Sequence, residues 1–408
     1  MLVQNLPLPL DRRVWQEAIA LRDAGFQVVA VCPQGVDRHT AELEEIDGIE
    51  IHRYPPRTST GGAAGYLREY ASAFRHMRRH IRRLSRDRRF DVVHAASPPD
   101  FLLLAALPLK RRGTRFVFDH HDLSPELYAS RYGPHRGPFY RVLLAAEWIA
   151  YRLANVVIAT NESYRGIALG RGGKDAADVF VVRNGPSLDR FHGATADAAL
   201  RRGKRHLLAY VGMMGPQDGI DYALQALADL RTRRDDWHAL FLGDGDVVPA
   251  MRLLTDELGL ADAVTFGGMA NDEQIGRALA TADVCLSPEP SNPLNDVSTM
   301  IKVAEYMAAG RPIVAFDLPE TRATAQDAAL YARPNDAADF ASQIDVLLSA
   351  ADRREGMGAS GRHRVERALS WDVSVRELHT AYDRLLPGRA PRVGTSTALR
   401  EVNTNAVA

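Results

Sequence analysis

The chain has 408 residues, which is more than one small hydrophobic core needs, so we expect two domains. Apolar residues make up 46% of the sequence and charged residues 25%, as in soluble globular proteins. The formal net charge is zero, so no overall field attracts nucleic acid, and no nucleic-acid partner is expected.

The sequence predicts a cytoplasmic protein. Cys32 and Cys285 fall in separate predicted strands, which favours a reducing compartment over a disulfide framework. The first residues lack the basic-then-apolar order of a signal peptide, and the longest apolar run, 101–109, is too short to span a bilayer. A peripheral position on the inner face of the plasma membrane is left open.

Segments typical of strands and helices alternate along the whole chain, which favours α/β layers with parallel sheets. Asp11 is typical of an N-cap, and Gly25 ends the helix that we predict over 12–24. The predicted strands of the first half lie at 27–32, 49–54, 91–94, 116–118, 156–159 and 179–182. Longer helices are predicted at 66–86 and 139–153. Either residues 1–5 form a shortened first strand, or the start of the sequence lies too far downstream.

A strong turn signal, Arg183-Asn184-Gly185-Pro186, predicts the end of a first domain over residues 1–186. The polar stretch 187–205 is typical of a linker, and a second α/β series covers 206–370. The predicted strands of this series lie at 207–211, 238–242, 263–266, 284–286 and 313–316. Its helices are predicted at 222–231, 247–258, 271–280 and 299–309. A last helix is predicted over 371–387, and 388–408 lacks periodicity and is expected to be disordered.

The most informative stretch of the chain is 298–314. A polar loop opens a helix that carries Lys302 and Glu305, and Gly310 ends this helix before an apolar strand. Helix N-termini attract phosphate through unpaired backbone amides and the helix dipole, and an acidic side chain further along can bind two ribose hydroxyls. The stretch therefore indicates a seat for a nucleoside diphosphate. An ordinary helix–strand unit is the alternative.

Glycine-rich turns follow three other predicted strands of the second half. The first contains Gly212, Gly215 and Gln217, and its small residues let backbone amides approach an anion. It has neither the Gly-Lys-Ser/Thr ending of a P-loop nor the glycine spacing of a dinucleotide fingerprint. The other two contain Gly243 and Gly268. We expect all three turns on the rim formed by the carboxyl ends of the strands, although tight turns without a ligand give the same pattern.

In the first half, acids and histidines crowd together just past a buried strand, in the run Asp119-His-His-Asp-Leu-Ser-Pro-Glu. His120 and His121 point in opposite directions if the strand persists, so at most one of them faces a given cleft. The spacing matches none of the common metal signatures. We therefore expect a histidine positioned for hydrogen bonding, and no metal.

The predicted helix 66–86 combines an apolar stripe with many arginines. Nine arginines occur within 22 residues, at positions 68, 75, 78, 79, 82, 83, 86, 88 and 89. A basic amphipathic helix favours contact with anionic lipid, and a solvated face above a packed stripe is the alternative. RNA is disfavoured, because exposed aromatic residues are not interleaved and no known module is present.

Taken together, these motifs resemble those of the retaining glycosyltransferases of family 4, and among them a bacterial branch of capsule, O-antigen and exopolysaccharide assembly. The resemblance covers nearly the whole chain. It implies an α/β GT-B fold, with two Rossmann-like domains facing across a cleft and a C-terminal helix crossing back to the first. It also implies transfer of a sugar from a nucleotide-diphosphate sugar to a hydroxyl of a sugar or lipid-linked acceptor, with retention of anomeric configuration. No cofactor and no metal are expected.

The same resemblance implies the site residues. Glu305 matches a glutamate that binds ribose hydroxyls, and His121 matches a histidine near the transferred sugar. The residues expected to be catalytic are His121, Lys302 and Glu305. The residues expected to bind the donor are Gly212, Gly215, Gln217, Gly243, Gly268, Asn295, Asp296, Ser298, Thr299, Lys302 and Glu305. The residues expected on the acceptor side are Arg12, Arg13, His120, His121 and Asp122.

Two departures from the family pattern concern the donor side. Val297 stands where the family commonly has a second glutamate, so contacts to the sugar are expected from Asn295 or Asp296, or are lost. The usual basic pair of the glycine-rich turn corresponds to Met213 and Asp218. Lys302 is therefore the candidate cation for the diphosphate.

A third departure lies near the N-terminus, where the Pro-rich segment 7–13 replaces a glycine pair, and Arg12 or Arg13 is expected to serve instead. Two other functions stay open at the level of sequence. One is a nucleotide-sugar epimerase on the same two-domain plan. The other is a non-catalytic nucleotide-sugar-binding or scaffold subunit, which the changes at 213, 218 and 297 favour.

Overall fold

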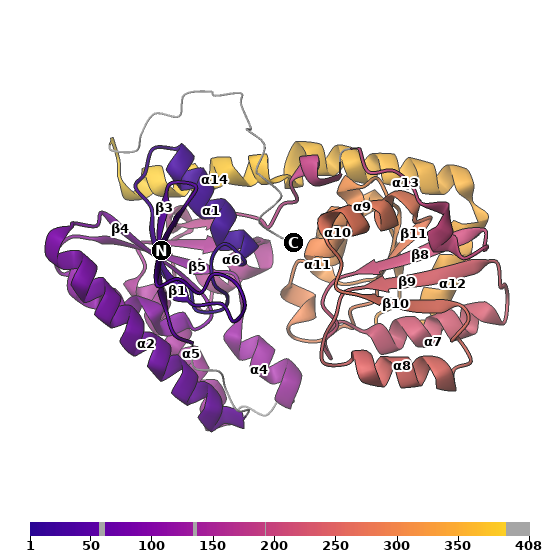
Figure 1. The fold of residues 1–408 in the computed structure, drawn as a ribbon, viewed down its shortest axis with the longest axis horizontal. Helices are drawn as coiled ribbons and strands as arrows, with labels where there is room; N and C mark the ends of the chain where they lie inside the picture. Colours follow the sequence, from indigo (N-terminus) through magenta and orange to yellow (C-terminus); the bar gives the residue numbers. More distant parts are fainter. Residues whose placement is uncertain (57–61, 134–136, 192, 389–408) are drawn as a thin grey trace. The chain divides into compact units, whose positions relative to one another are not determined.

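The computed structural model describes residues 1–56, 62–133, 137–191 and 193–388 (Figure 1). The chain divides into two compact units. Among the described residues, unit 1 consists of Met1–Asn184 and residues 374–388, and unit 2 consists of Gly185–Val373. The boundaries predicted at 186 and 371 lie close to these divisions. The tail predicted to be disordered lies, apart from Gly388, outside the described residues.

The sheet of unit 1 has two parts that the first residues of the chain join. One part has the order β1 (Val29–Pro33), β3 (Ile49–Tyr54), β2 (Leu43–Ile46), and the other the order β4 (Val92–Ala96), β5 (Arg115–His120), β6 (Val156–Ala159), β7 (Val179–Val181). Leu2 pairs in parallel with both Val31 and Ala95, and its amide donates to the carbonyl of His94 at 2.8 Å. The first residues thus take the place of a shortened strand between β1 and β4.

Most helices of unit 1 follow directly from local signals. Their bounds are α1 (Arg12–Asp23), α2 (Gly62–Asp87), α3 (Leu107–Lys110), α4 (Ser124–Tyr132), α5 (Pro138–Leu153) and α6 (Glu162–Leu169). Asp11 caps α1 as predicted, because its carboxylate accepts the amide of Val14 at 3.1 Å. Asn161 caps α6 in the same way by accepting the amide of Tyr164 at 2.7 Å.

The last described helix, α14 (Trp371–Leu385), returns to unit 1, as the resemblance implies. Tyr382 is buried, its hydroxyl lies 2.9 Å from Nδ1 of His94 in a hydrogen bond, and its ring meets that of Phe26 edge-on at 5.3 Å. Arg384 of the same helix pairs with Asp178 at 3.1 Å. These contacts connect α14 to β4, to the end of α1 and to the segment before β7.

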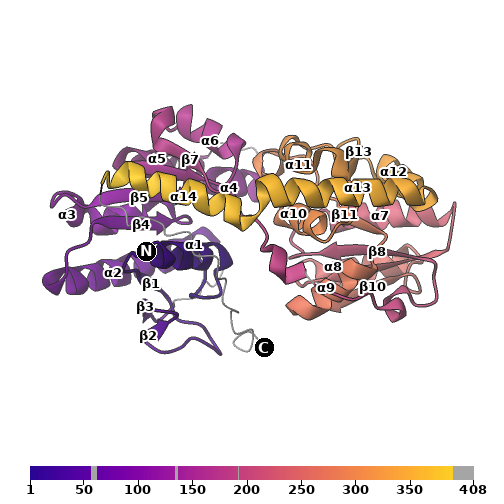
Figure 2. The same ribbon diagram turned by 90° about the horizontal axis from the view of Figure 1, so that it is seen from above.

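Unit 2 is a six-stranded parallel sheet between two layers of helices (Figure 2). Its strands run in the order β10 (Val264–Gly268), β9 (Trp237–Leu242), β8 (His206–Val211), β11 (Val284–Ser287), β12 (Ile313–Phe316), β13 (Ala329–Ala332). Its helices are α7 (Ile220–Arg231), α8 (Val248–Glu257), α9 (Asp272–Thr281), α10 (Ile301–Ala308), α11 (Pro319–Ala325), α12 (Ala337–Ser349) and α13 (Ala351–Arg364).

Both faces of this sheet are buried, as continuous apolar strands predict. Along β8, Leu208 and Tyr210 face the core that contains Trp237, whereas Leu207 and Ala209 face the core on the other side. Because side chains alternate along a strand, each face of the sheet is apolar and is covered by helices. The loops at the carboxyl ends of the strands are therefore left for a site.

The segment predicted as a linker, 187–205, packs on unit 2. It forms short 3-10 helices at Leu188–Phe191 and Ala198–Arg201, and Phe191 is buried in the second of the two cores. Arg201 pairs with Asp283 and donates to the carbonyl of Thr281. Among the described helices of either unit, none is long and apolar enough to cross a bilayer.

The contacts of Tyr382 predict that α14 stabilises unit 1. Tyr382→Phe leaves the buried Nδ1 of His94 without its partner and should lower the free energy of unfolding by about 1–3 kcal/mol. Arg384→Ala removes only an exposed ion pair and should cost about 0–1 kcal/mol. Urea unfolding of both variants checks this, and equal effects of the two substitutions would contradict it.

Candidate functional site

The order of the strands in unit 2 reverses between β8 and β11, and we call the space outside the carboxyl ends of these two strands the crevice. From β8 the chain moves outward through β9 and β10, and then returns to β11 on the other side of β8 before continuing to β12 and β13. In open α/β sheets, ligands bind outside the carboxyl ends of the strands at such a reversal. The loops at this point are 212–219 and 288–300, which contain most of the predicted donor residues.

Two of the predicted glycines make room for other parts of the protein. A Cβ on Gly212, whose φ is +152°, would lie 2.9 Å from Cε of Lys302. A Cβ on Gly243 would lie 1.9 Å from the carbonyl oxygen of Gly212. Gly268 has φ +72° and open space around its Cβ position, so only its conformation requires glycine. These turns therefore come together at one rim, but close packing against the protein itself, with a side chain at Gly212 and with backbone at Gly243, explains two of the glycines.

Lys302 is 8% exposed and is surrounded by acidic and hydroxyl groups. Its Nζ donates to Glu289 Oε1 at 2.5 Å and to the Tyr210 hydroxyl at 2.7 Å, and lies 3.5 Å from Asp218 Oδ1. Burial by itself lowers the pKa of Lys302, but the Glu289 carboxylate and its other neighbours raise the pKa well above the ordinary value. The lysine is therefore charged, and carboxylates share its charge.

Glu289 is a residue of this site that the sequence interpretation missed. It is 1% exposed, and Oε2 accepts from the hydroxyl of Ser287 at 2.5 Å. The sequence feature that could have indicated Glu289 is its position between Pro288 and Pro290, directly after the strand β11.

Asn295 and Asp296, two of the predicted donor residues, are hydrogen-bonded within the loops of the crevice. The side-chain amide of Asn295 is buried and donates to the carbonyls of Gln217 and Pro290, each at 2.8 Å, so it fastens the two loops of the crevice together. Asp296 accepts from Ser291 at 3.1 Å within its own loop. Both amide hydrogens of Asn295 are thus used inside the protein, and the contact with the sugar expected of this residue stays a prediction.

Glu305 is half-buried on α10 and already has a cationic partner. Arg190 donates to its carboxylate and also pairs with Asp272 at 2.8 Å. Upstream, the hydroxyl of Ser298 donates to the carbonyl of Leu294 at 2.7 Å, and that of Thr299 donates to Glu320 at 3.4 Å. Met300, the N-cap residue of α10, makes no side-chain cap hydrogen bond, and the positive end of the helix dipole lies at this N-terminus.

In unit 1, two of the predicted acceptor-side residues, Arg13 and His121, meet in a network around Asp119. The guanidinium of Arg13 contacts Asp119 at 2.7 Å and Glu17 at 3.1 Å, and donates to the side chain of Asn184 at 2.5 Å. Arg13 therefore fixes the carboxylate of Asp119 and joins α1 to the end of β5. It does not project from the Pro-rich segment as an exposed cation. Arg12, next to it, is exposed.

Asp119 in turn holds His121. Its Oδ2 lies 3.0 Å from Nδ1 of His121 in a hydrogen bond. Burial by itself lowers the pKa of His121, but the charge of Asp119 outweighs this effect and raises the pKa to about 9. His121 is therefore an imidazolium ion at neutral pH, and both of its ring nitrogens carry a hydrogen.

The two neighbouring histidines separate, as the alternation of a strand predicts. His120 is fully buried, and its Nδ1 lies 2.7 Å from the hydroxyl of Tyr151. Burial lowers the pKa of His120 to about 3, so this ring is neutral. His121 is partly exposed, and the carboxylate of Asp122 lies 4.0 Å from its Nε2. The structure thus keeps His121 and Asp122 as candidates and places His120 in the core.

Glu17, His94 and Asp119 offer oxygen and nitrogen atoms within 4.8 Å of one another, which is suitable for a metal ion. The guanidinium of Arg13 contacts both of these carboxylates. The positive charge at this cluster is therefore supplied by the protein.

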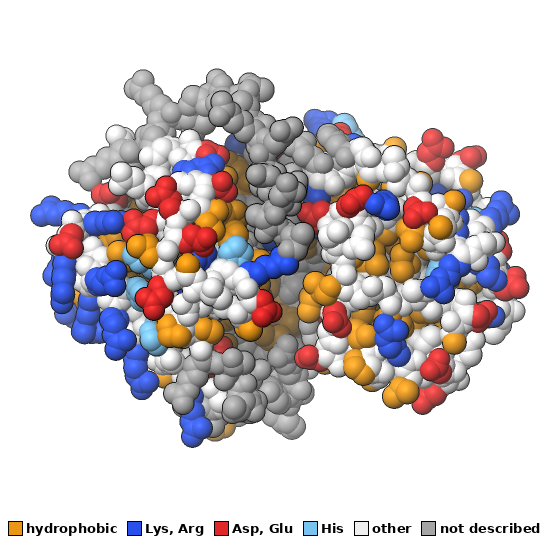
Figure 3. Space-filling view, in the orientation of Figure 1, with side chains coloured by type: hydrophobic (Ala, Val, Ile, Leu, Met, Phe, Trp, Pro, Cys, Tyr) orange, Lys and Arg blue, Asp and Glu red, His pale blue; other side chains and the backbone are white. Residues whose placement is uncertain are grey.

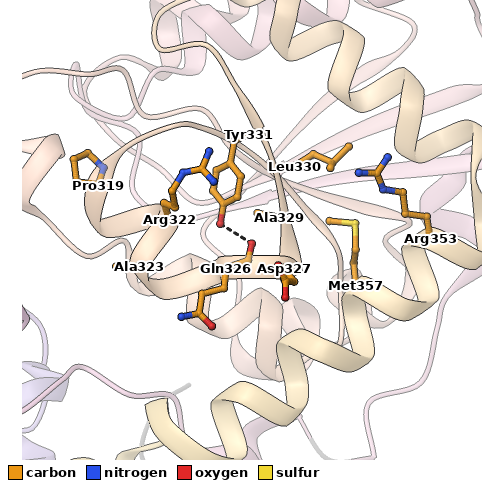
Figure 4. Close-up of a pocket in the computed structure, with 10 residues that line it drawn as sticks. All are labelled: Pro319, Arg322, Ala323, Gln326, Asp327, Ala329, Leu330, Tyr331, Arg353 and Met357. Atoms are coloured by element: carbon orange, nitrogen blue, oxygen red, sulfur yellow. Dashed lines mark hydrogen bonds between the residues drawn. The ribbon is translucent and has the colours of Figure 1, made fainter.

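A cavity of about 760 Å³ lies at the other end of the sheet of unit 2, beside the edge strand β13 (Figure 4). Arg322 lies 4.0 Å from the ring of Tyr331, and the hydroxyl of Tyr331 donates to the carbonyl of Gln326 at 2.8 Å. Arg322 also pairs with Asp317 at 2.6 Å. Because these polar groups satisfy one another, the cavity does not compete with the crevice as the main site.

Both halves of the chain match family models. Residues 10–190 match the model described as Glycosyltransferase Family 4, and residues 205–350 match the model described as Glycosyl transferases group 1. These ranges correspond to most of unit 1 and most of unit 2.

Relatives and solved structures agree with these matches. The chain is 31% identical over 50% of its length to a GDP-mannose-dependent alpha-(1-6)-phosphatidylinositol monomannoside mannosyltransferase of Mycobacterium tuberculosis, and spans about half (55%) of that relative. It is 26% identical to a phosphatidyl-myo-inositol mannosyltransferase of Mycobacterium leprae, over 93% of this chain and 94% of the relative. The sucrose-phosphate synthase of Thermosynechococcus elongatus has the same fold, with a TM-score of 0.75, 18% identity and coverage of 94% and 98%. The GT-B fold predicted from the sequence is thereby confirmed.

The Asp119–His121 pair predicts an alkaline histidine titration. His121 should titrate near pH 9. Its protonated form should add stability that is fully present below the unfolded-state pKa of about 6.5 and is lost as the pH rises through about 9. Histidine ring NMR, with His121→Gln to assign the signal, checks this. A transition near pH 6.5 for that signal would show that Asp119 does not hold the proton.

Proposed function

We propose that this chain, which carries a Family 4 glycosyltransferase domain followed by a group 1 glycosyl transferase domain, moves a sugar from a nucleotide-diphosphate sugar to a hydroxyl of an acceptor. The observation that carries the proposal is the crevice between β8 and β11. There a buried ammonium, a half-buried carboxylate and the uncapped N-termini of α7 and α10 meet at one rim.

In the proposed donor site, backbone amides and side chains both bind the nucleotide. The first amides of α7 and α10 and the ammonium of Lys302 bind the diphosphate, since helix N-termini and cations both favour anions. Glu305 lies almost one turn beyond Lys302 on the same helix and binds the ribose hydroxyls. Arg190 holds the Glu305 carboxylate in place, so the carboxylate oxygens that accept the ribose hydroxyls are oriented before the nucleotide binds.

The proposed reaction proceeds with retention at the anomeric carbon. Departure of the diphosphate leaves positive charge on the ring carbon and negative charge on the phosphate, which the amides and Lys302 stabilise. A phosphate oxygen takes the proton of the acceptor hydroxyl, so no strong protein base is required. His121 carries its own proton and therefore acts as a hydrogen-bond donor to the transferred sugar rather than as a base. The proposal includes no metal.

A sugar or lipid-linked acceptor fits the relatives, whose names include phosphatidylinositol-based acceptors. A role in bacterial surface polysaccharide or glycoconjugate synthesis at the inner face of the plasma membrane is part of the proposal. The support in this chain is α2. Its apolar stripe packs inward, with Met77 and Ile81 buried, and its arginines face outward over one side of unit 1 (Figure 3). Contact with lipid would therefore be electrostatic, without insertion of an apolar face.

The ribose role of Glu305 is testable by comparing two ligands. Glu305→Gln should weaken GDP or UDP binding by about 1.5–3 kcal/mol, or roughly 10- to 100-fold, because a hydrogen bond to a charged group is lost. Binding of inorganic pyrophosphate, which has no ribose, should not change. Calorimetry measures both.

Asp272→Asn is the matched control for this variant, because it also removes a partner of Arg190 but leaves Glu305 in place. It should leave nucleotide affinity unchanged. Loss of pyrophosphate and nucleoside diphosphate binding to the same extent in the Glu305 variant would refute the ribose role. Absence of nucleotide binding by both the unaltered protein and its Asp218→Asn variant would refute the proposed function.

The membrane proposal predicts salt-sensitive binding to anionic vesicles. The protein should float with phosphatidylglycerol vesicles at low salt and be released at high salt, because salt screens exposed charges. Substitution of all three of Arg79, Arg82 and Arg86 by glutamine should abolish flotation. The matched control places the same substitutions on unit 2, at Arg233, Arg353 and Arg367. Equal loss in both variants, or flotation that salt does not affect, would contradict the assignment to α2.

A further inference from the structure

An acidic side chain occupies the position where the crevice of unit 2 offers hydrogen-bond donors to an anion. Asp218 Oδ2 accepts the backbone amide of Gly215, in the glycine-rich turn, at 2.9 Å. Its other oxygen lies 3.5 Å from the ammonium of Lys302. A backbone amide of a glycine turn and a lysine are the two kinds of donor that a phosphate oxygen takes. The carboxylate therefore uses the same donors that the proposed diphosphate needs.

The charge around this position is unfavourable for a second anion. Asp218 and Glu289 each bring one negative charge and Lys302 brings one positive charge, so the cluster with both acids ionised has an excess of one negative charge. The side chain of Lys302 is 9% exposed and that of Asp218 is 14% exposed, so water screens these charges weakly. A diphosphate that entered without any change in the cluster would meet a net repulsion.

Of the two acids, Asp218 is the one able to move. Glu289 is 1% exposed, is bound by both Lys302 and Ser287, and lies below the rim. Asp218 lies in the turn between Gly215 and Gly219 at the rim, and its carboxylate is held by one backbone amide and one ammonium. A rotation of the Asp218 side chain frees the amide of Gly215 and one face of the lysine, and it breaks no other side-chain contact that the structure shows for this residue.

We propose that Asp218 is a placeholder for one phosphate of the donor. In the ligand-free protein it satisfies the amide of Gly215 and balances the charge of Lys302, and on donor binding it gives both groups to the diphosphate. This inference rests on the proposed function and adds that the affinity of the seat is set by competition with an internal carboxylate. Asp218 stands where the family pattern has a basic residue. It therefore does more than remove a contact with the diphosphate, because its carboxylate competes with the diphosphate for the same donors.

The competition has a pH dependence of defined sign. The titratable groups that face Asp218 are Lys302 from α10, Glu289 from the loop after β11 and Tyr210 from β8. Burial raises the pKa of Asp218, and Lys302 opposes this change. Protonation removes the competing charge, so affinity for a nucleotide should rise as the pH falls through the pKa of Asp218.

The test compares nucleotide affinity in variants that differ by one charge. Asp218→Asn should bind GDP or UDP at least about tenfold more tightly than the unaltered protein, and the pH dependence of affinity should flatten. Asp218→Ala is a second variant, which also removes the volume of the side chain, and it should show the same direction. Thermal unfolding without ligand confirms that each variant is folded.

Asp244→Asn is the matched control. Asp244 lies after β9 on the same rim and is exposed, and its carboxylate accepts the amide of its own neighbour Gly245 at 2.8 Å. Removing its charge should change affinity by less than about twofold, because exposed charges at a distance are screened. An equal gain in the Asp244 and Asp218 variants would overturn the inference, since general charge would then explain the effect.

The remaining outcomes separate this inference from the proposed function. Binding by the unaltered protein with equal or weaker binding by both Asp218 variants would overturn the placeholder role, and Asp218 would then position Lys302 for the nucleotide. Binding only by the Asp218 variants would support the inference. Absence of binding by every variant would overturn the proposed function and this inference with it.

Discussion

A charge that is buried inside a protein must be neutralised by a partner, and this requirement organises both units. In unit 1 the guanidinium of Arg13 meets Asp119 and Glu17, and in unit 2 the ammonium of Lys302 meets Glu289. Taking such ions out of water is costly, so each cluster is compensated by hydrogen bonds from several elements. The ends of strands and the starts of helices are held in position as a result.

The two clusters have different chemical consequences. Around Arg13 the network leaves one group, His121, with an extra proton, so the partly exposed end of the network is a hydrogen-bond donor. Around Lys302 the network leaves an excess of acid, so the partly exposed end is an acceptor. Unit 1 therefore presents a positive group beside the end of β5, and unit 2 presents a cation whose availability depends on its acidic neighbours.

Local signals in the sequence predicted most of the fold. The strand at 49–54 and the N-cap at Asp11 have the predicted positions, because burial and capping are decided by adjacent residues. The helices α3, α4, α6, α11, α12 and α13 and the strands β2 and β13 were missed. The apolar spacing of α13 is interrupted by glycines at 356, 358 and 361. The glycine turns and Glu305 could be placed at the rim of the crevice. The pairing of Lys302 with Glu289 could not, because it joins residues on two elements whose approach depends on the order of the strands.

The position of α14 has a consequence for how the protein is made. Tyr382 and His94 are separated by 288 residues, and all of unit 2 lies between them in the chain. Contacts across such a separation form late, since a long loop must close first. During translation, the surface of unit 1 around Phe26 and His94 stays exposed while unit 2 is synthesised and folds. It is covered only after α14, which follows unit 2 in the chain, has been translated. The second domain can thus mature before the first, although it is the first whose codons are read earliest.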